Sequence, residues 1–370
     1  MNLLGNRADE TYTYRRVDWD TWQEGTDLGD VVSGSIELGA FTDLKATCSF
    51  SFMGQEAPEQ DSLIRIYYSF KDDDGEVAEF MLGTFLICFS TVTQVEDRLS
   101  GTADGYSVLK VLNDRKYGMP FTVSAGELPV SKAVALMEGL GLRVNVGEES
   151  SYALTSDHTF DPDDSYLTIV NWLLTSADYM AVTPDASGIC QVRKANPSRS
   201  PVATFEDDEQ SIMYPEVSTE NDWQSTPNVV RAYYEDDTCA IYATAKNLSG
   251  SKASLDNRGN RELTLYESVS ELDGADAASK LVNLKAYSLN KLLNNSGEIE
   301  RVSLSHPYVP ILPNDAIQVR YGDFEWVGNV TNMRVNLAPS TKCETETRRL
   351  TAPTITVDDS ENGILWEVSK

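Results

Sequence analysis

Hydrophobic and polar residues alternate along the first hundred residues of the chain, which is the pattern of β-strands with one buried face. Turn-forming residues divide this region into segments 31–38, 46–52, 63–70, 79–90 and 100–106. Between the third and fourth segments, Asp74 and Gly75 supply the positive φ that a tight hairpin requires. Strands at this spacing predict a continuous antiparallel β domain over residues 1–106, either a barrel or a sandwich.

From residue 107 the apolar period lengthens from two residues to three or four, which predicts helices. Short helices are expected to start at 107–112 and to span 131–140, where Gly141 acts as the C-cap. The clearest helix follows Asp163 and Asp164, either of which is placed to accept hydrogen bonds from its first amides. Its apolar face consists of Tyr166, Ile169, Val170, Leu173, Leu174 and Ala177. With strands at 142–146, 179–182 and 189–192, residues 107–200 are predicted to form a small α+β domain.

Residues 201–350 return to strands and are predicted to form a second β-barrel-like domain. Its strands are expected at 228–234, 239–245, 298–305, 316–321 and 324–337. A helix at 275–293, within an insertion over about 250–297, interrupts it. Glu271 and Asp273 suit the positive start of that helix, and residues 294–297 end it. Residues 351–370 are predicted to form a tail or a hairpin, with 354–357 paired to 364–368, that docks elsewhere.

The two β regions contain one internal likeness. Segment 63–68 leads to Gly83 as segment 316–321 leads to Gly328. The matching positions are Ile64 with Ile317, Ile66 with Val319, and Tyr68 with Tyr321. Alternating strands often look alike by chance, so the likeness alone leaves a duplication open. The fold class predicted from all these patterns is α+β and predominantly β, with two related barrel-like domains and smaller inserted α+β domains.

The charge of the chain is strongly acidic, with 58 Asp and Glu against 30 Lys and Arg and a net charge of −28. Such a surface repels the phosphates of nucleic acids, and it also keeps a crowded assembly protein soluble. The length of 370 residues predicts two or three domains, and 41% hydrophobic residues provide for their cores.

No pattern of catalytic or ligand-binding residues occurs in the chain. The two histidines, His158 and His306, have no nucleophile motif near them, and no phosphate-binding glycine loop is present. Residues 72–74 lack the alternating acids of a calcium loop, and the acidic runs 161–164 and 206–209 are interpreted as a helix cap and a solvated loop. The sequence therefore predicts no catalytic residue, no metal site, no cofactor and no enzyme.

The five cysteines lie far apart and none has metal-ligand spacing. Cys48 and Cys88 fall inside predicted strands, where a reduced thiol serves as a small apolar side chain, so a reducing compartment is expected. The N-terminus has no apolar run of the signal-peptide type, and no stretch of the chain reaches transmembrane length. We therefore expect no membrane insertion by this chain.

Five short phrases stand out along the chain: residues 104–109 (DGYSVL), 167–173 (LTIVNWL), 226–230 (TPNVV), 258–261 (RGNR) and 312–317 (LPNDAI). Together with the order of the predicted domains, they resemble the central baseplate hub and tail-associated proteins of tailed phages and related injection machines. The resemblance implies two related β domains per chain, so that a homotrimer presents a six-fold-like ring to the tail tube. It implies a structural role at the virion tail tip, assembly in the cytoplasm of the bacterial host, and DNA that passes through without specific binding.

The partners implied by this resemblance are further copies of the chain, tail-tube and other distal tail proteins, and a tail fibre or cell-wall-degrading protein. An alternative is a β-rich carbohydrate-binding or surface-adhesion module, because the six tryptophans could stack on sugars. A glycosidase is a third possibility, since it needs only two carboxylates.

Overall fold

The computed structural model describes residues 7–72, 74–194, 200–207, 217–222, 225–269, 272, 274–295, 298–340, 342–351 and 355–368. It divides into two compact units, which we call unit 1 and unit 2. Unit 1 comprises Met1–Val217 and Ser303–Thr347, and unit 2 comprises Ser218–Val302 and Arg348–Lys370. The prediction of a predominantly β protein with smaller α+β parts is confirmed.

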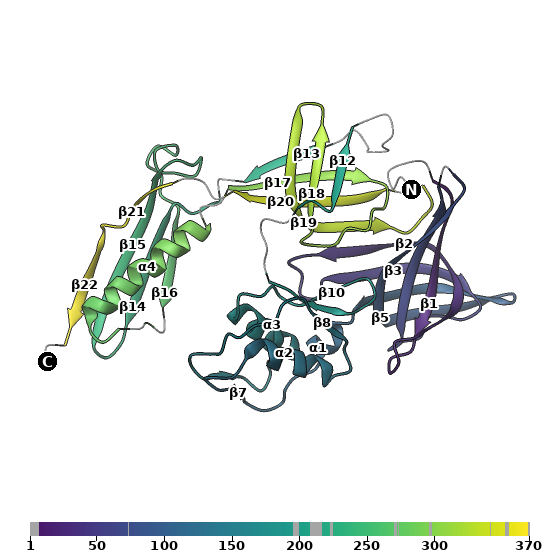
Figure 1. Cartoon of the computed structure of the whole chain (residues 1–370), viewed down its shortest axis with the longest axis horizontal. Helices are drawn as coiled ribbons and strands as arrows, with labels where there is room; N and C mark the ends of the chain where they lie inside the picture. Colours follow the sequence, from purple (N-terminus) through teal and green to yellow (C-terminus); the bar gives the residue numbers. More distant parts are fainter. Residues whose placement is uncertain are drawn as a thin grey trace. The chain divides into compact units, whose positions relative to one another are not determined.

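The N-terminal part of unit 1 is a closed ring of six strands, which we call the strand ring (Figure 1). Its strands are β1 (Ala8–Val17), β2 (Glu24–Gly39), β3 (Ala46–Gly54), β4 (Leu63–Lys71), β5 (Val77–Val95) and β6 (Arg98–Ser107). They are paired in the order β1-β4-β5-β6-β3-β2, and β1 also pairs with β2. Alternate residues point inward, and the rings of Tyr14, Phe50 and Phe52 pack together with centroids 5.9–6.5 Å apart.

A second set of strands continues the same sheet from residues 35–39 of β2. It consists of β12 (Ala203–Glu206), β13 (Val217–Asp222), β17 (Glu298–His306), β18 (Ala316–Tyr321), β19 (Phe324–Asn336) and β20 (Cys343–Thr351). The order runs β2-β19-β20-β17-β13, while β18 pairs with β19 and with β12. The whole sheet therefore has twelve strands.

Between the two strand sets the chain forms a small α+β lobe, residues 108–194, which lies within unit 1. Its helices are α1 (Lys110–Asp114), α2 (Pro129–Glu138) and α3 (Tyr166–Ser176). Its strands are β7 (Phe121–Val123), β8 (Val144–Val146), β9 (His158–Phe160), β10 (Thr183–Pro184) and β11 (Cys190–Val192). Its core is continuous with Val17, Trp22 and Leu63 of the strand ring, so hydrophobic packing fixes the lobe on the ring.

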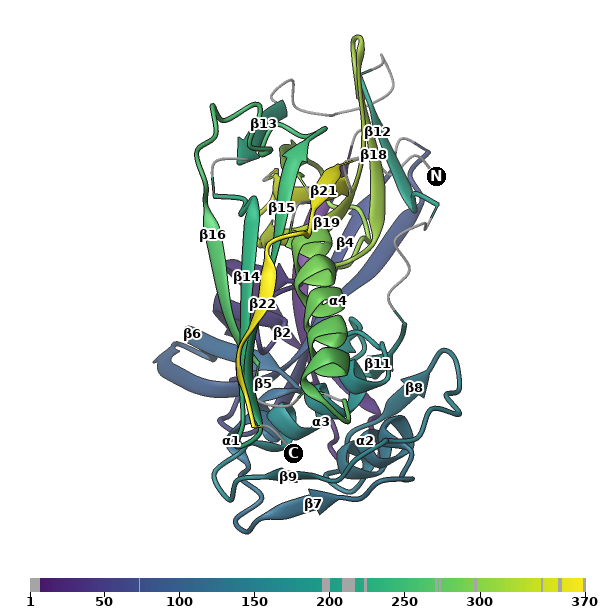
Figure 2. The same ribbon diagram turned by 90° about the vertical axis from the view of Figure 1, so that its left-hand side faces the viewer.

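Unit 2 contains an open sheet with one helix on one face. The strands are β14 (Val229–Glu235), β15 (Cys239–Ser249), β16 (Thr264–Val269), β21 (Thr356–Asp358) and β22 (Asn362–Glu367), and the helix is α4 (Ala277–Asn295). Figure 2 shows α4 lying along β14 and β15, with β21 and β22 at one edge. Leu284 and Leu292 of α4 are fully buried against this sheet. The 229–249 hairpin therefore packs against α4. The sequence analysis had assigned this hairpin to the second β-barrel-like domain and the helix to an insertion over about 250–297.

The helix boundaries differ from the predicted ones in three places. Ser165, not Asp163 or Asp164, caps α3: its Oγ accepts the amide of Thr168 at 3.1 Å, because the carboxylate of Asp164 already accepts the amide of Asp161. Helix α2 ends at Glu138 with Gly139 as its cap, and Gly141 takes a positive φ of 82° two residues later. Helix α1 begins only at Lys110, because Ser107 ends β6.

Helix α4 is where the sequence predicts a helix, but its first turn is held by Asp276. Its Oδ1 accepts the amide of Ser279 at 2.8 Å. Glu271 and Asp273, the acids that the sequence analysis assigned to this helix start, lie outside the described residues. So do Ser296 and Gly297, two of the residues predicted to end the helix.

Two predictions about strands are wrong, and β1 was not singled out within the predicted β domain. Residues 179–182 are not a strand; the amide of Val182 instead donates to the Asn171 side chain at 3.0 Å, and only Thr183–Pro184 pair with β11. The C-terminal segments do not pair with each other, because β21 and β22 both pair with β15, one after the other along its edge.

Candidate functional site: the junction of two strand sets and the lobe

The histidines are structural. His306 is fully buried, with Nδ1 2.6 Å from the Pro307 carbonyl oxygen and Nε2 2.7 Å from Oγ1 of Thr345. Burial lowers the pKa of its imidazole to about 4, so the ring is neutral near pH 7. His158 stacks on Trp172 with ring centroids 3.9 Å apart. The Thr345 hydroxyl bonded to His306 is buried with it, so this pair has no access to a substrate that a nucleophile would attack.

The acidic and cysteine residues considered from the sequence also have structural surroundings. Asp72 accepts the amides of Asp74 and Glu76 in the β4–β5 turn, while Asp73 lies outside the described residues. Glu206 forms an ion pair with Arg320 across the parallel pairing of β12 and β18. No group of three or more potential metal ligands occurs among the described residues.

Four of the five cysteines are buried, and Cys88 is half-buried. Burial raises the pKa of the Cys190 and Cys343 thiols to about 12, which keeps both of them protonated and unreactive. In the described part of the chain, no helix is both long and apolar enough to cross a membrane.

The tryptophans do not form a sugar-stacking platform in the described residues. Trp22 and Trp326 are buried, and Trp326 donates to Oγ1 of Thr347 at 2.9 Å. Trp172 packs against the lobe core, and Trp19 lies beside Trp22. Trp366 is 40% exposed, and Trp223 lies outside the described residues.

The side chains that do converge lie where the lobe meets the strand ring, around Arg65 of β4. Arg65 is 7% exposed; its Nε donates to Oγ1 of Thr84 at 3.0 Å and its Nη2 donates to the Ser187 carbonyl at 2.8 Å. Its Nη1 forms an ion pair with Glu24, whose carboxylate also accepts the Tyr67 hydroxyl at 2.6 Å. Burial alone would raise the pKa of Glu24, but the hydrogen bonds from Tyr67 and Arg65 lower it overall. Arg65 thus joins two ring strands to the lobe.

The lobe contributes a tight turn, residues 184–188, to this contact. Oδ1 of Asp185 accepts the amides of Ser187 and Ile189, and Oδ2 accepts Nε2 of Gln191 at 2.7 Å. Gly188 has a φ of 85°, and a Cβ there would lie 2.8 Å from the Trp22 ring. Because the Asp185 carboxylate is fully engaged within its own turn, it serves to shape the loop rather than to bind a ligand.

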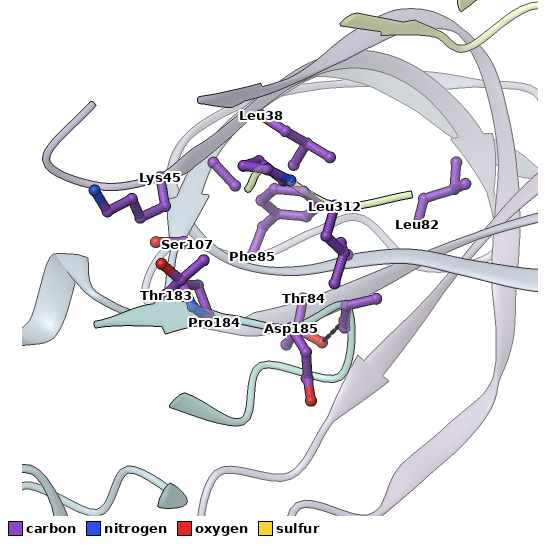
Figure 3. Close-up of a pocket in the computed structure, with 14 residues that line it drawn as sticks. Leu38, Lys45, Leu82, Thr84, Phe85, Ser107, Thr183, Pro184, Asp185 and Leu312 are labelled. Carbon is purple, nitrogen blue, oxygen red and sulfur yellow. Dashed lines mark hydrogen bonds between the residues drawn. The ribbon is translucent and has the colours of Figure 1, made fainter. Parts of the chain in front are cut away.

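A shallow pocket marks the point where ring, lobe and second strand set meet (Figure 3). Leu38 and Phe85 come from the ring, Thr183 and Pro184 from the lobe, and Leu312 from the loop before β18. Thr84 donates to the Ala186 carbonyl at 2.9 Å along its wall. Lys45 lies at its side with Nζ bonded to the Ala40 carbonyl at 2.7 Å, and burial lowers the pKa of this amine. The lining is mostly apolar, and its charged residues Lys45 and Asp185 are engaged by the Ala40 carbonyl and within the 184–188 turn, so the pocket is suited to packing.

The pairing of β2 with β19 joins the two strand sets directly. Five residue pairs run from Asn332 opposite Gly39 to Asn336 opposite Ser35. Met333 and Val335 are buried on one face, and Arg334 faces Glu37 on the exposed face at 3.8 Å. These antiparallel pairs join two six-stranded sets in one sheet.

An aromatic cluster makes a second link between the strand sets. The Tyr308 ring, in the loop after β17, contacts the rings of Tyr68 and Phe80 with centroids 5.7 and 5.8 Å apart. Arg7 donates to the Tyr308 carbonyl at 2.5 Å and lies over the Phe70 ring at 4.5 Å. The two strand sets are therefore locked by packing as well as by backbone pairing.

Of the phrases quoted from the sequence, 167–173 lies within α3, whereas 226–230, 258–261 and 312–317 contain turns or junctions. Asn228 is fully buried; its Nδ2 donates to the carbonyls of Ala253 and Arg261, and its Oδ1 accepts the amide of Leu263. Asn314 has a φ of 71°, and its amide donates to the Val330 carbonyl. None of the junction residues around Arg65 was predicted, although a lone arginine between Ile64 and Ile66 was an available signal.

Comparison with known proteins places this fold among phage tail proteins. No protein-family model matches the chain, and no curated protein matches it either. The tail protein from Neisseria meningitidis MC58 has a similar structure, with a TM-score of 0.61 at 15% identity, over 92% of this chain and 96% of that one. The 43 kDa tail protein of prophage MuSo2 from Shewanella oneidensis gives 0.60 at 10% identity, over 92% and 98%.

Two further solved structures extend the comparison. The prophage tail protein gp18 from Listeria monocytogenes EGD-e gives a TM-score of 0.53 at 12% identity, over 91% of this chain and 94% of that one. A chain of the Francisella PdpA-VgrG complex gives 0.55 at 6% identity, over 96% of this chain and 55% of that one. At these identities the likeness establishes the fold, and the resemblance to phage tail proteins stated from the sequence is confirmed at that level.

Proposed function

We propose that this protein is a structural component of a phage or phage-like tail tip, a homotrimeric baseplate hub that caps the tail tube. The observation that carries the proposal is the pairing of β2 with β19, which puts two six-stranded sets into each chain. Three copies then contribute six such sets, which suits a ring docked on a tube of six-fold symmetry. The fold similarity to the tail proteins of Neisseria and Shewanella supports the same role.

A duplication of the strand sets would underlie this symmetry, and it stays a prediction. The matched positions Ile64, Ile66, Ile317 and Val319 are all fully buried. Gly83 lies opposite Ile66 and Gly328 lies opposite Ile317, so the two hairpins share a glycine facing an isoleucine, with a register offset of two residues. One difference remains, because β12 runs parallel to β18 whereas β1 runs antiparallel to β4. The finer division of unit 1 at residues 106 and 200 also stays a prediction.

In such a hub the channel would pass DNA without binding it. The net charge of −28 supports this part of the proposal, because an acidic wall does not retain phosphates. The hub acts by assembly and carries out no reaction of its own. Its location would be the virion tail tip after assembly in the host cytoplasm, and its partners would be the tail tube and distal tail proteins.

The test is the mass of the purified protein by light scattering over a concentration series, followed by negative-stain imaging. We expect a particle of three times 40.9 kDa with three-fold ring views. A strict monomer at every concentration would contradict the trimer. A glycan-array screen of the same sample distinguishes the hub from the alternative, a carbohydrate-binding or surface-adhesion module. Such a module would bind sugars selectively as a monomer.

A further inference from the structure

The two edges of the sheet in unit 2 differ in how they are protected. Among the described residues, β16 forms one edge and pairs only with β14, while β21 and β22 form the other and pair only with β15. At the β16 edge, Glu267 sits mid-strand and accepts hydrogen bonds from Lys291 and Tyr287 of α4 at 3.2 Å. A charge in the middle of an edge strand is a common protection against pairing with another strand.

Strand β22 has no charged side chain in its middle, although its pairing with β15 shifts register by one residue at Leu365, between Ile364 and Trp366. Ile364, Leu365 and Trp366 are 42%, 58% and 40% exposed, and Val368 just beyond the strand is 57% exposed. No charged residue lies between Asn362 and Trp366. Apolar residues on consecutive positions suit a strand covered on both faces and paired on both sides, which is the environment of an interior strand.

The other half of the same edge is protected. Between β21 and β22 the chain bulges at 359–361, where three residues lie opposite two of β15. Asp358 is bonded to Ser360, and Glu361 forms an ion pair with Lys246 at 2.6 Å. Charged side chains are a usual means of blocking an edge. The part of this edge without a charged side chain is therefore confined to residues 362–366.

We propose that β22 is a docking edge for an extended segment of another protein, which adds to the sheet of unit 2 as one further strand. Main-chain hydrogen bonds to the free edge would supply the binding, and contacts to Leu365 and Trp366 would supply apolar burial. The acidic residues Asp359 and Glu361 precede the apolar run and Glu367 follows it. The partner strand is accordingly apolar in its centre and carries lysine or arginine at its ends.

A second copy of this chain fits the edge poorly. If two β22 strands paired antiparallel, Glu367 of each copy would approach Glu361 of the other. If they paired parallel, each glutamate would lie beside its counterpart. Both arrangements bring like charges together, whereas a strand with basic ends neutralises them. Docking at β22 does not require the proposed trimer, so each can fail while the other holds.

The test measures binding of a fluorescein-labelled probe peptide to the full-length protein by fluorescence anisotropy. The probe alternates valine and threonine and has lysines at both ends, and a matched peptide has glutamates there instead. We expect the lysine-ended peptide to bind and the glutamate-ended peptide to bind far more weakly. Leu365→Lys should weaken binding roughly tenfold or more, because a charge on the edge opposes strand addition.

The matched control is Tyr266→Lys, which adds the same charge at a 71% exposed position on the opposite edge. It should leave binding unchanged, so a loss in Leu365→Lys cannot come from net charge alone. Circular dichroism checks that both variants fold. The proposal is overturned if neither peptide binds, if both bind equally, or if the two variants behave alike. Self-association of the wild type that Leu365→Lys abolishes would also overturn it, in favour of a second copy.

Discussion

The strand ring of unit 1 and the sheet of unit 2 deal with their edges in different ways. The ring returns on itself through the pairing of β1 with β2, so its six strands have few unpaired backbone groups. The sheet of unit 2 stays open and depends on α4 to cover one face, with edges that are protected unequally. Closure removes the need for protective charges, whereas an open sheet leaves a place where another chain can add.

The largest loss of stability should follow the truncation of a core side chain in either unit. Phe85→Ala in the ring should lower the free energy of unfolding of unit 1 by about 3–5 kcal/mol, and Leu284→Ala should lower that of unit 2 by about 2–5 kcal/mol. Both side chains are almost completely buried. Urea titration followed by segment-resolved hydrogen exchange should show each variant shifting only its own unit. One shared transition that both variants shift would contradict separate cores.

His306 should make its own contribution to the pH dependence of unit 1, because its imidazole is buried in the neutral form there. Its pKa falls from 6.5 to about 4 on folding, so the unfolded chain binds more protons between these values and stability falls as pH is lowered through this range. The loss attributable to His306 is on the order of 3 kcal/mol. Unfolding of the wild type and of His306→Gln should be compared from pH 7 to 4. Parallel stability curves would refute the assignment.

Arg65 should matter more than an exposed arginine on the same sheet. Arg65→Met removes the Arg65 ion pair of Glu24, which keeps its hydrogen bond from Tyr67, and removes the Arg65 donor to the Ser187 carbonyl; it should lower stability by about 2–3 kcal/mol. The matched control is Arg334→Met, whose side chain is 52% exposed and whose ion pair is 3.8 Å long; it should change stability by less than about 0.5 kcal/mol. Chemical denaturation measures both. Equal losses would mean that the Arg65 contacts do not hold the lobe.

Two glycines with the same φ separate backbone strain from crowding. Gly188 and Gly118 both have a φ of 85°, but a Cβ would meet Trp22 at Gly188 and nothing within 4 Å at Gly118. Gly118→Ala should cost about 1 kcal/mol from the backbone alone. Gly188→Ala should cost about 1–3 kcal/mol more, because the turn must move from the ring. Thermal unfolding gives the difference; if the two variants match, the lobe contact is looser than the structure indicates.

The smallest change in stability should follow substitutions on the edge strands of the unit 2 sheet. Leu365→Lys and Tyr266→Lys should each change the unfolding free energy by less than about 0.5 kcal/mol, because both side chains are mostly exposed. Leu365→Lys should raise the protein concentration at which light scattering detects aggregates, since it places a charge on the apolar edge strand β22. If Leu365→Lys leaves the aggregation unchanged, then β22 does not promote aggregation.

The strands and helices that the sequence predicted well are those with an apolar face. The apolar spacing in α3 predicted the helix, because residues three and four positions apart lie on the same buried face: Ile169, Val170, Leu173 and Leu174. Strand β20 was missed because its buried face carries Thr345 and Thr347, hydroxyls that are satisfied by His306 and Trp326. A buried face made of satisfied polar groups has no hydrophobic signature in the sequence.

Strand partners were less predictable than the strands themselves. The segments that became β21 and β22 were close in sequence and suited a hairpin, yet both pair with β15, because a strand's alternation does not specify its neighbour. The pairing of β2 with β19 joins residues roughly 300 positions apart, and Arg65 meets Ser187 only after the lobe has folded. The candidate site therefore could not be predicted from local patterns in the sequence.

The pairing of β2 with β19 also bears on how the chain folds as it is synthesised. All strands of the ring lie before residue 108, so the ring can close while the ribosome is still making the lobe. Once the ring is complete, residues 35–39 remain without this partner until 332–336 are made, and at about 5–20 residues per second the 224 residues from 108 to 331 take some tens of seconds. During that interval Glu37 is the charge that discourages a neighbouring nascent chain from taking the place of β19.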